Sequence, residues 1–253
     1  MNSKWFRRYT TTAGNGPRLV CFPHAGGSAT AYTHLARTLP ADLDVVAVQY
    51  PGRQDRYREE SFTSLPLLVE AVAEELAREI AADSGRPYAL FGHSMGSLVA
   101  YETARLLAER GLPGPQRLFL SGRGGPTAHP HAPYHHFDDA QVLAEVRRLG
   151  GTDQSMLDNP DVLEMVLPAL RADYRALGTY SWSGGEPLAT PVTALIGDND
   201  PMVTVPEAGT WREHTSGAFD LKVFPGGHFY LFDQVGEVAA AVTEGLLAGS
   251  VAS

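Results

Sequence analysis

The chain alternates between short continuous apolar runs and longer segments in which apolar residues recur every three or four positions. A short apolar run bounded by turn residues is typical of a buried strand, and the wider spacing is typical of an amphipathic helix. Strands are therefore expected at residues 18–22, 45–49, 87–91, 117–121, 191–197 and 219–224. Helices are expected between them at residues 30–39, 65–82 and 95–110. This alternation predicts an α/β fold in which helices flank a mostly parallel central sheet.

The helix expected at residues 65–82 has the clearest pattern. Its apolar side chains recur every four positions, at Leu68, Val72, Leu76 and Ile80. Side chains at this spacing lie on one face of a helix. We expect that face to pack against the sheet.

The alternation of strands and helices stops between about residues 122 and 186. Two helical segments are expected there among loops, at residues 138–149 and 161–180. A loop-rich insertion between two core strands is a common place for a lid over an active site. Most of its apolar residues should pack on the core, and a few should line an acyl channel. They are Leu143, Met156, Leu157, Leu163, Met165, Val166, Leu167 and Leu170. The sequence thus predicts one domain, residues 1–253, with a helical lid at about residues 122–186.

One short segment at a junction of strand and helix predicts chemistry. It reads Gly92-His93-Ser94-Met95-Gly96, and it follows an apolar run and precedes a helix-forming stretch. A Gly-x-Ser-x-Gly turn in this context is typical of a nucleophile elbow, in which the serine occupies a strained turn at a helix N-terminus. Side chains at positions 92 and 96 would collide with the neighbouring strand or helix. Ser94 is the predicted nucleophile.

The partners of Ser94 should follow it in the chain, first an acid and then a histidine. His228 comes after the last predicted strand, and two aspartates, Asp198 and Asp200, follow the strand before it. Catalytic groups collect at the carboxyl ends of strands in open α/β sheets. His228 would take the proton of Ser94, and one aspartate would hold its other ring nitrogen. We assign Asp200, because it lies farther from the strand end and Pro201 stiffens the loop behind it. Asp198 remains the alternative, and the other aspartate would form a turn.

A glycine-rich loop follows the first predicted strand. It reads Pro23-His24-Ala25-Gly26-Gly27-Ser28. Such a loop supplies one backbone N–H of an oxyanion hole, and the residue after the nucleophile supplies the other. We therefore assign the two donors to Ala25 and Met95. The loop lacks the Gly-x-Gly-x-x-Gly and Walker patterns of phosphate binding. A role in orienting the loop is favoured for His24 over catalysis, because it precedes the serine in the chain.

Composition narrows the class of protein. The 253 residues carry a formal net charge of −9, which disfavours general nucleic-acid binding. No apolar run is long enough to span a membrane, and residues 1–19 lack the apolar stretch of a secretory signal. Cys21 is the only cysteine, and we expect it to pack in the core. Because no internal disulfide is possible, the cytoplasm is the expected compartment.

Two clusters of polar residues admit more than one interpretation. Histidines crowd one loop, at His129, His131, His135 and His136. They lack the spacing of metal ligands, so no metal site is predicted. Arginines follow one strand, at Arg53, Arg56 and Arg58. They could bind a phosphate or an acidic protein, but Asp55, Glu59 and Glu60 could equally neutralise them.

Five motifs together resemble those of a known family. They are Phe22-Pro23-His24-Ala25-Gly26-Gly27-Ser28, Tyr50-Pro51-Gly52-Arg53, Phe91-Gly92-His93-Ser94-Met95-Gly96, Gly197-Asp198-Asn199-Asp200 and Gly227-His228-Phe229. The set resembles the type II thioesterases, stand-alone enzymes that accompany modular polyketide synthases and nonribosomal peptide synthetases. The similarity extends from about Trp5 to Leu247.

The resemblance implies an α/β-hydrolase fold with a helical lid and a catalytic triad at Ser94, Asp200 and His228. It also implies hydrolysis of acyl thioesters on the phosphopantetheine arm of acyl or peptidyl carrier proteins, an editing step that clears stalled or wrongly loaded units in antibiotic biosynthesis. No metal or organic cofactor is expected, because the phosphopantetheine arrives on the carrier protein. A monomer is expected, with neither nucleic acid nor membrane as a partner.

Other functions remain compatible with the same residues. A general carboxylester hydrolase or an acyltransferase would share the triad, because motifs do not encode the leaving group or the acceptor. A protein that only docks on a synthase is disfavoured by the complete set of triad residues. A peroxidase-like hydrolase is compatible with the fold alone, and fold does not decide function.

Overall fold

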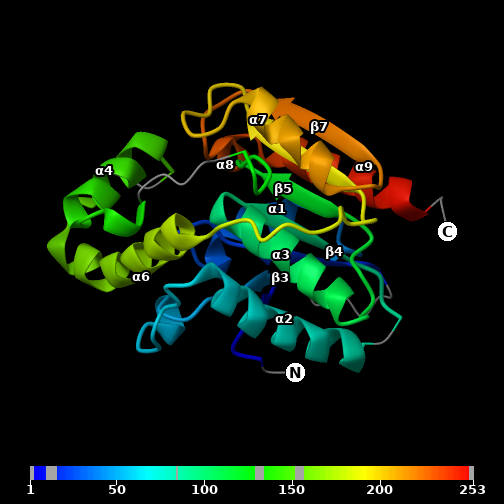
Figure 1. Ribbon diagram of the computed structural model, residues 1–253, viewed down its shortest axis with the longest axis horizontal. Helices are drawn as coiled ribbons and strands as arrows, with labels where there is room; N and C mark the ends of the chain where they lie inside the picture. Colours follow the sequence, from blue (N-terminus) through cyan, green and yellow to red (C-terminus); the bar gives the residue numbers. More distant parts are fainter. Residues whose placement is uncertain (1–2, 10–15, 84, 129–133, 152–156, 251–253) are drawn as a thin grey trace.

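A seven-stranded sheet forms the centre of the molecule (Figure 1). The computed structural model describes residues 3–9, 16–83, 85–128, 134–151 and 157–250. Its strands are β1 (Phe6–Arg8), β2 (Arg18–Phe22), β3 (Asp44–Val48), β4 (Tyr88–His93), β5 (Leu118–Ser121), β6 (Val192–Gly197) and β7 (Phe219–Phe224). They lie in the order β1-β3-β2-β4-β5-β6-β7. β1 pairs antiparallel with β3, and the other pairings are parallel, as the alternation of strands and helices predicted.

Successive residues of the central strands point to opposite faces of the sheet. In β2, Val20 and Phe22 pack in one apolar core, whereas Leu19 and Cys21 pack in the other. Strands that are apolar on both faces need helices on both sides, which is the usual arrangement of parallel sheets. Cys21 is fully buried, in agreement with its predicted packing role.

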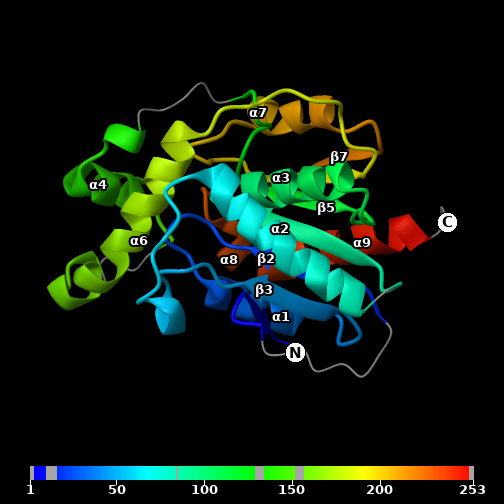
Figure 2. The same cartoon turned by 60° about the horizontal axis from the view of Figure 1, so that its bottom comes forward.

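Helices cover both faces of the sheet (Figures 1 and 2). α2 (Leu65–Ala82) and α3 (Met95–Glu109) pack on one face, and α1 (Thr33–Thr38) and α9 (Val235–Ser250) pack on the other. Shorter elements are η1 (Ala29–Tyr32), η2 (Gln54–Arg56), η3 (Tyr134–His136), η4 (Thr210–His214), α7 (Val205–Gly209) and α8 (Tyr230–Asp233). None of the described helices combines the length and the apolar character that crossing a membrane requires.

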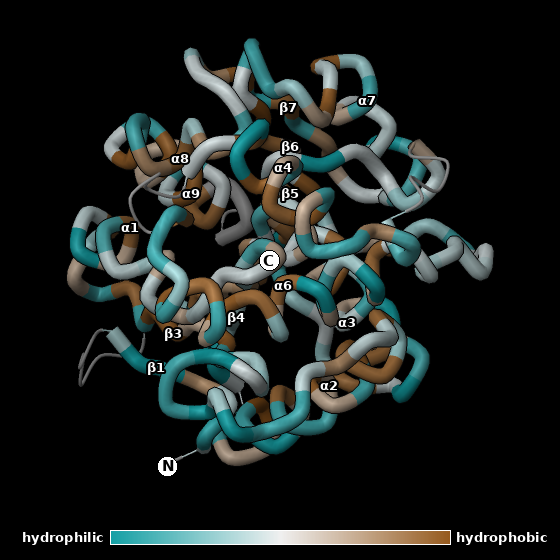
Figure 3. The backbone as a smooth tube through the Cα atoms, turned by 90° about the vertical axis from the view of Figure 1, so that its left-hand side faces the viewer, coloured by the Kyte–Doolittle hydropathy of each residue, from teal (hydrophilic) through white to brown (hydrophobic). Residues whose placement is uncertain are grey.

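The apolar face predicted for α2 is the face that packs on the sheet. Leu68, Val72 and Leu76 are buried, and Ile80 is partly buried against the same core. Figure 3 shows the same division across the molecule, with hydrophobic residues along the central strands and hydrophilic residues on the outer loops.

Two helices of the predicted insertion stand at one end of the sheet, between β5 and β6 in the chain (Figures 1 and 2). They are α4 (Asp139–Leu149) and α6 (Pro160–Thr179), and we call this pair the lid. Asp138 caps α4 by accepting a hydrogen bond from the backbone N–H of Gln141. Asn159 caps α6, whose first residue is a proline. Both helices begin and end within one residue of their predicted limits.

Three features differ from the predicted elements. β1 was not expected, because its three residues include two arginines and form no apolar run. α9 was not expected either, because residues 235–250 are mostly small or apolar, with few polar positions to mark an amphipathic pattern. The helix expected at residues 30–39 is divided into the 3₁₀ helix η1 and the short α1.

The amino end of the sheet contains a buried carboxylate. Asp44, at the start of β3, has no exposed surface. It accepts hydrogen bonds from Arg8 (2.6 Å), Arg18 (2.8 Å) and Arg86 (2.9 Å). Hydrogen bonds from several guanidinium groups offset the cost of removing a carboxylate from water. This cluster links the edge strand β1 to the rest of the sheet.

Candidate active site

Ser94 lies at the turn between β4 and α3, with φ 55° and ψ −118°. This positive φ is unfavourable for a residue with a side chain, so the turn is strained. A Cβ atom on Gly92 would lie 2.2 Å from the carbonyl oxygen of Gly96. A Cβ atom on Gly96 would lie 2.0 Å from the carbonyl oxygen of Phe22 in β2. Both positions therefore require glycine, as predicted from the motif.

Hydrogen bonds to β5 hold this turn in place. The backbone N–H of Ser94 donates to the carbonyl oxygen of Ser121 at 2.8 Å. The hydroxyl of Ser97, one turn into α3, accepts from the N–H of Ser121 at 3.0 Å. The same hydroxyl lies 2.9 Å from the carbonyl oxygen of Gly92 and 2.8 Å from that of Ser121. Ser97 was not singled out by sequence, and its position in the elbow helix is the only signal that could have indicated it.

His228 and Asp200 form a buried pair at the carboxyl ends of β7 and β6. The Nδ1 atom of His228 donates to Asp200 Oδ2 at 2.8 Å, and both side chains are fully buried. The other carboxylate oxygen of Asp200 accepts from the backbone N–H groups of Met202 (2.8 Å) and Val203 (3.3 Å). These bonds leave the carboxylate only one orientation, with Oδ2 toward the imidazole.

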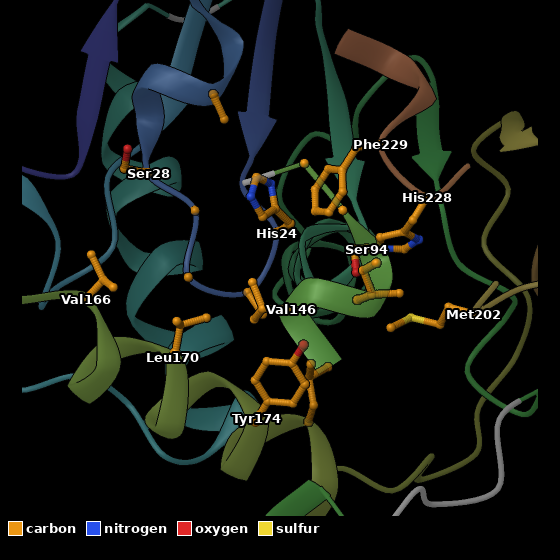
Figure 4. Close-up of a pocket in the computed structure, with 18 of the residues that line it drawn as sticks. His24, Ser28, Ser94, Val146, Val166, Leu170, Tyr174, Met202, His228 and Phe229 are labelled. Atoms are coloured by element: carbon orange, nitrogen blue, oxygen red, sulfur yellow. The ribbon is translucent and has the colours of Figure 1, made fainter. Parts of the chain in front are cut away.

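The second ring nitrogen of His228 is unpaired among the described residues. Nε2 of His228 is buried and has no hydrogen-bond partner in the described part of the chain. His228 and Ser94 line the same cavity, and Figure 4 shows the two side chains next to each other. With Nδ1–H bound to Asp200, the Nε2 lone pair is available to accept the Ser94 proton.

Asp198 does not contact His228. Its side chain is exposed, and Oδ1 accepts from the backbone N–H of Gly226 at 2.9 Å and from the Asn199 amide at 2.7 Å. Asp198 therefore joins the loop after β6 to the turn that precedes His228. This is the turn-forming role that was expected of whichever aspartate does not face the histidine.

The glycine-rich loop after β2 places Ala25 at the cavity, and Met95 is the first residue of α3. Their two backbone N–H groups have no acceptor among the described residues. The next N–H in the loop, that of Gly26, donates to the Asp173 carboxylate at 2.7 Å. Gly26 has φ +73°, a conformation that favours glycine.

Asp173 connects this loop to the lid. It lies on α6, is 1% exposed, and pairs with Arg53. Arg53 in turn donates to the carbonyl oxygen of Pro51 at 2.6 Å. The interpretation of Arg53 as a residue for an external phosphate or acidic partner is wrong, because its guanidinium is buried and already paired.

The two neighbouring arginines have separate surroundings. Arg56 is buried, donates to the carbonyl oxygen of Gln49 at 2.6 Å, pairs with Glu59, and lies over the ring of Trp5. Arg58 is exposed and contacts Tyr57. Of the three, only Arg58 presents its charge to solvent.

A cavity of about 370 Å³ lies between the lid and the sheet (Figure 4). Its catalytic side holds His24, Ala25, Ser94 and His228. Its lid side is apolar and comprises Val146, Leu149, Leu157, Val162, Val166, Leu170 and Leu177. Three residues predicted as candidates for an acyl channel line this cavity, namely Leu157, Val166 and Leu170. Met165 is instead 64% exposed, and Met156 lies outside the described residues.

Two further imidazoles surround His228. His93 is fully buried, and its Nδ1 lies 2.9 Å from the Ser121 hydroxyl. Burial, with smaller effects of His228 and His24, holds the pKa of His93 well below its ordinary value. Burial, His228 and Arg53 lower the pKa of His24 to about 3. Both rings are therefore neutral at physiological pH, and His24 packs edge-on against Phe229 with ring centres 4.8 Å apart.

The histidine-rich loop is described only in part. His129 and His131 lie outside the described residues, and His135 and His136 belong to η3. Within the ranges that the structure describes, no group of three His, Cys, Asp or Glu side chains is placed to hold a metal ion.

Comparison with known proteins decides the family. Residues 17–245 match the thioesterase domain family. The chain belongs to the thioesterase family. This thioesterase is 44% identical over 243 residues to thioesterase PikA5 of Streptomyces venezuelae, covering 96% of this chain and 85% of PikA5. It is 37% identical over 233 residues to the gramicidin S biosynthesis protein GrsT of Aneurinibacillus migulanus, covering 91% and 89% of the two chains.

A solved structure of a similar protein agrees with this assignment. The thioesterase superposes on the type II thioesterase BorB from the borrelidin biosynthetic cluster with a TM-score of 0.85 and 40% identity, covering 97% and 99% of the two chains. These relatives place it among the type II thioesterases of the α/β-hydrolase fold, as the five motifs predicted. It is a hydrolase that acts on thioesters.

Proposed function

We propose that this thioesterase uses Ser94, His228 and Asp200 to hydrolyse acyl thioesters on the phosphopantetheine arm of acyl or peptidyl carrier proteins. Its task would be to remove aberrant or stalled acyl units from a polyketide or nonribosomal peptide synthase. The names of two relatives support this setting: GrsT is a gramicidin S biosynthesis protein, and BorB comes from the borrelidin biosynthetic cluster. The proposal is carried by the position of Ser94 and His228, which line the same cavity. Nδ1 of His228 is bound to Asp200, and its Nε2 has no hydrogen-bond partner among the described residues.

In the first half of the reaction, His228 Nε2 takes the proton of Ser94 as Oγ attacks the thioester carbonyl carbon. The carbonyl oxygen becomes an oxyanion and accepts hydrogen bonds from the N–H groups of Ala25 and Met95. When the intermediate collapses, the carbon–sulfur bond breaks, and the thiolate leaves and takes the proton from His228. The acyl group remains on Ser94 as an ester.

Water completes the reaction. His228 Nε2 takes a proton from a water molecule, whose oxygen attacks the acyl carbon. The same two N–H groups stabilise the second oxyanion. Collapse returns the proton to Ser94 Oγ and releases the carboxylic acid. Asp200 keeps the imidazole oriented and stabilises its charged form throughout.

The shape of the site favours an acyl group that is carried on a narrow, extended chain. Ser94 is 6% exposed and lies in a cavity between lid and sheet. A folded carrier protein is too large to enter a space of this size, so the acyl group has to arrive on an extended chain. Phosphopantetheine is such a chain. We also propose that residues 1–253 act as a single-domain monomer, in which residues 122–186 contribute the lid.

The test compares three substrates with the same short acyl group: the thioester of a phosphopantetheinylated carrier protein, a small-molecule thioester and an oxyester. Wild type, Ser94→Ala and the matched control Ser216→Ala, at an exposed position, should be measured side by side. We expect hydrolysis that depends on Ser94 and is fastest for the carrier-bound thioester. Good turnover of the oxyester with no preference for the carrier would favour a general carboxylester hydrolase, and hydrolysis retained by Ser94→Ala would reject the proposed nucleophile.

A further inference from the structure

Arg123 lies beside the proposed catalytic residues but takes no part in the reaction described above. It follows β5 and Gly122, and it lines the same cavity as Ser94 and His228. A Cβ atom on Gly122 would lie 2.6 Å from Cε1 of His93 and 3.4 Å from Cε1 of His228. The backbone that carries Arg123 therefore runs directly against these imidazoles. Its carbonyl oxygen accepts from the Trp211 indole at 2.8 Å, which holds this backbone in place.

Arg123 is largely buried and has no counterion among the described residues. The residue is 9% exposed, and its Nε atom is buried with no hydrogen-bond partner. No carboxylate in the described part of the chain pairs with it. The titratable groups that influence it are the phenols of Tyr134 and Tyr180, and burial lowers its pKa.

The other buried arginines show that this is unusual for the molecule. Each of those among the described residues pairs with a carboxylate: Arg18 with Asp44, Arg53 with Asp173, Arg56 with Glu59, and Arg117 with Asp220. A buried cation without a partner is costly, and removing it from water costs several kcal/mol in general. Packing on the core does not require a charge at position 123. A group on the substrate that enters the cavity is therefore the expected partner of this charge.

An acyl group that enters the cavity meets this cation. An acyl chain that fills the cavity displaces water from the guanidinium. A purely apolar chain leaves the cation without an acceptor, whereas a chain that ends in a carboxylate supplies one. The planar guanidinium matches a carboxylate with two parallel hydrogen bonds. Tyr134 lines the same cavity, and its phenol is a further hydrogen-bond donor for such a carboxylate.

We propose that Arg123 is a specificity residue that binds a carboxylate at the far end of the acyl group, so that this thioesterase accepts short dicarboxylic acyl thioesters. The proposal rests on the proposed function, because it assumes that the acyl group enters the cavity from Ser94. Besides Arg123, the described residues that line the cavity include histidines, hydroxyl groups and many apolar side chains, but no other arginine and no lysine, aspartate or glutamate. Arg123 is therefore the charged group that the site offers to an acyl carboxylate.

The experiment uses pairs of thioesters that differ in charge but hardly in shape. Malonyl, succinyl and glutaryl thioesters are compared with 3-methylbutanoyl, 4-methylpentanoyl and 5-methylhexanoyl thioesters, in which an isopropyl group replaces the carboxylate. The readout is the ratio of kcat/KM within each pair, after subtraction of the rate with Ser94→Ala. In the wild type we expect this ratio to exceed one for at least one chain length.

Arg123→Met should lower that ratio about ten- to a hundredfold, the usual effect of losing hydrogen bonds between charged groups. Arg123→Lys should restore part of it, since lysine keeps the charge but not the planar fork. The control Arg175→Met changes an exposed arginine of the lid and should leave the ratio as in the wild type.

Several outcomes would overturn the assignment. A wild-type ratio of one or less at all three lengths rejects it without any variant, so a variant that fails to fold does not protect it. An equal loss for charged and uncharged substrates in Arg123→Met also rejects it, as does equally fast hydrolysis of a matched neutral ketone. If the uncharged thioesters are not hydrolysed in a Ser94-dependent way, the proposed function itself fails, which is a separate result.

Discussion

Asp198 and Asp200 belong to the same loop, yet their surroundings assign them different tasks. Asp200 is buried, with one oxygen on two backbone N–H groups and the other on His228. Asp198 is exposed and bonds to the turn around Gly226. A shift of two residues along this loop therefore changes a carboxylate from a partner of the imidazole into a structural link. Sequence order alone had left both aspartates open as candidates.

These surroundings predict unequal effects of the same substitution. Asp200→Asn should lower kcat by roughly a thousand- to ten-thousandfold, because an amide cannot stabilise the imidazolium and favours the wrong ring tautomer. Asp198→Asn keeps an oxygen for the N–H of Gly226 and should lower kcat less than about tenfold. Steady-state hydrolysis of a small thioester measures both. The reverse ranking would show that the acid has been assigned to the wrong residue.

Helix α6 has two halves with different surroundings. Residues before Pro168 are exposed or half-buried, and two of them, Val162 and Val166, line the cavity. Residues after Pro168 are mostly buried, and Asp173 among them pairs with Arg53 and the N–H of Gly26. Since Gly26 directly follows Ala25, the lid helix contacts the loop that carries a proposed oxyanion donor.

The contacts of Asp173 should affect both stability and catalysis, and a single and a double variant separate the two effects. Asp173→Leu should reduce the free energy of unfolding by about 3–5 kcal/mol, because it leaves Arg53 buried without a partner. The double variant Arg53→Met/Asp173→Leu removes both charges and should recover much of that stability. Its kcat should remain about ten- to a hundredfold below wild type, since the N–H of Gly26 has lost the acceptor that orients the loop.

Denaturant unfolding and steady-state kinetics on the same preparations measure the two effects. If the double variant regains full kcat together with its stability, the carboxylate has only a structural role. The exposed lid pair Arg171–Asp139 offers a matched control, and Asp139→Leu should change neither quantity by more than a small amount.

The same helix shows where prediction from sequence ends. Its limits were predicted to within one residue, and those of α2 to the residue, because both helices depend on local patterns. The pairing of Arg53 with Asp173 joins residues 120 positions apart, and no local pattern encodes it. β1 was missed for a related reason: its strand state comes from pairing with β3 rather than from an apolar run of its own. Arg123 likewise became notable only when its lack of a partner could be seen.

Across the whole molecule, the two ends of the sheet have different roles. The carboxyl end carries Ser94, His228 and the cavity, whereas the amino end carries Asp44 with its three arginines. Function and stability can therefore be perturbed separately. Gly92 and Gly96, which the elbow requires, belong to the first end and cannot be exchanged without moving backbone atoms.

Asp44→Ala should test this separation. The substitution leaves Arg18 and Arg86 without their central acceptor, and it should reduce the free energy of unfolding by about 3–5 kcal/mol. The kcat per folded molecule should stay close to wild type, because the site lies at the opposite end of the sheet. Asp42→Ala, two residues earlier and exposed, is the matched control and should change the stability little. A large loss of kcat in folded Asp44→Ala would mean that the two ends are coupled.

The neutral imidazoles of His24 and His93 predict how stability depends on pH. His24 and His93 have pKa values below the ordinary value of 6.5, that of His24 at about 3. Below pH 6.5 the unfolded chain binds protons on these rings that the folded protein does not, so the free energy of unfolding falls as the pH falls. Each ring contributes at most about 1.4 kcal/mol per pH unit, and for His24 the effect ends near pH 3.

Denaturant midpoints of wild type, His24→Gln and the exposed control His34→Gln should be compared at pH 7, 6 and 5. The loss of stability from pH 7 to 5 should be smaller in His24→Gln, because one of the groups that protonates only in the unfolded chain is gone. His34→Gln, at an exposed position, is the matched control and should keep the wild-type slope. A His24→Gln slope equal to that of wild type would mean that His24 takes up a proton in the folded protein as readily as in the unfolded chain. A cation beside His228 would then oppose the imidazolium that the proposed reaction forms, so the neutrality of this ring matters for catalysis as well as for folding.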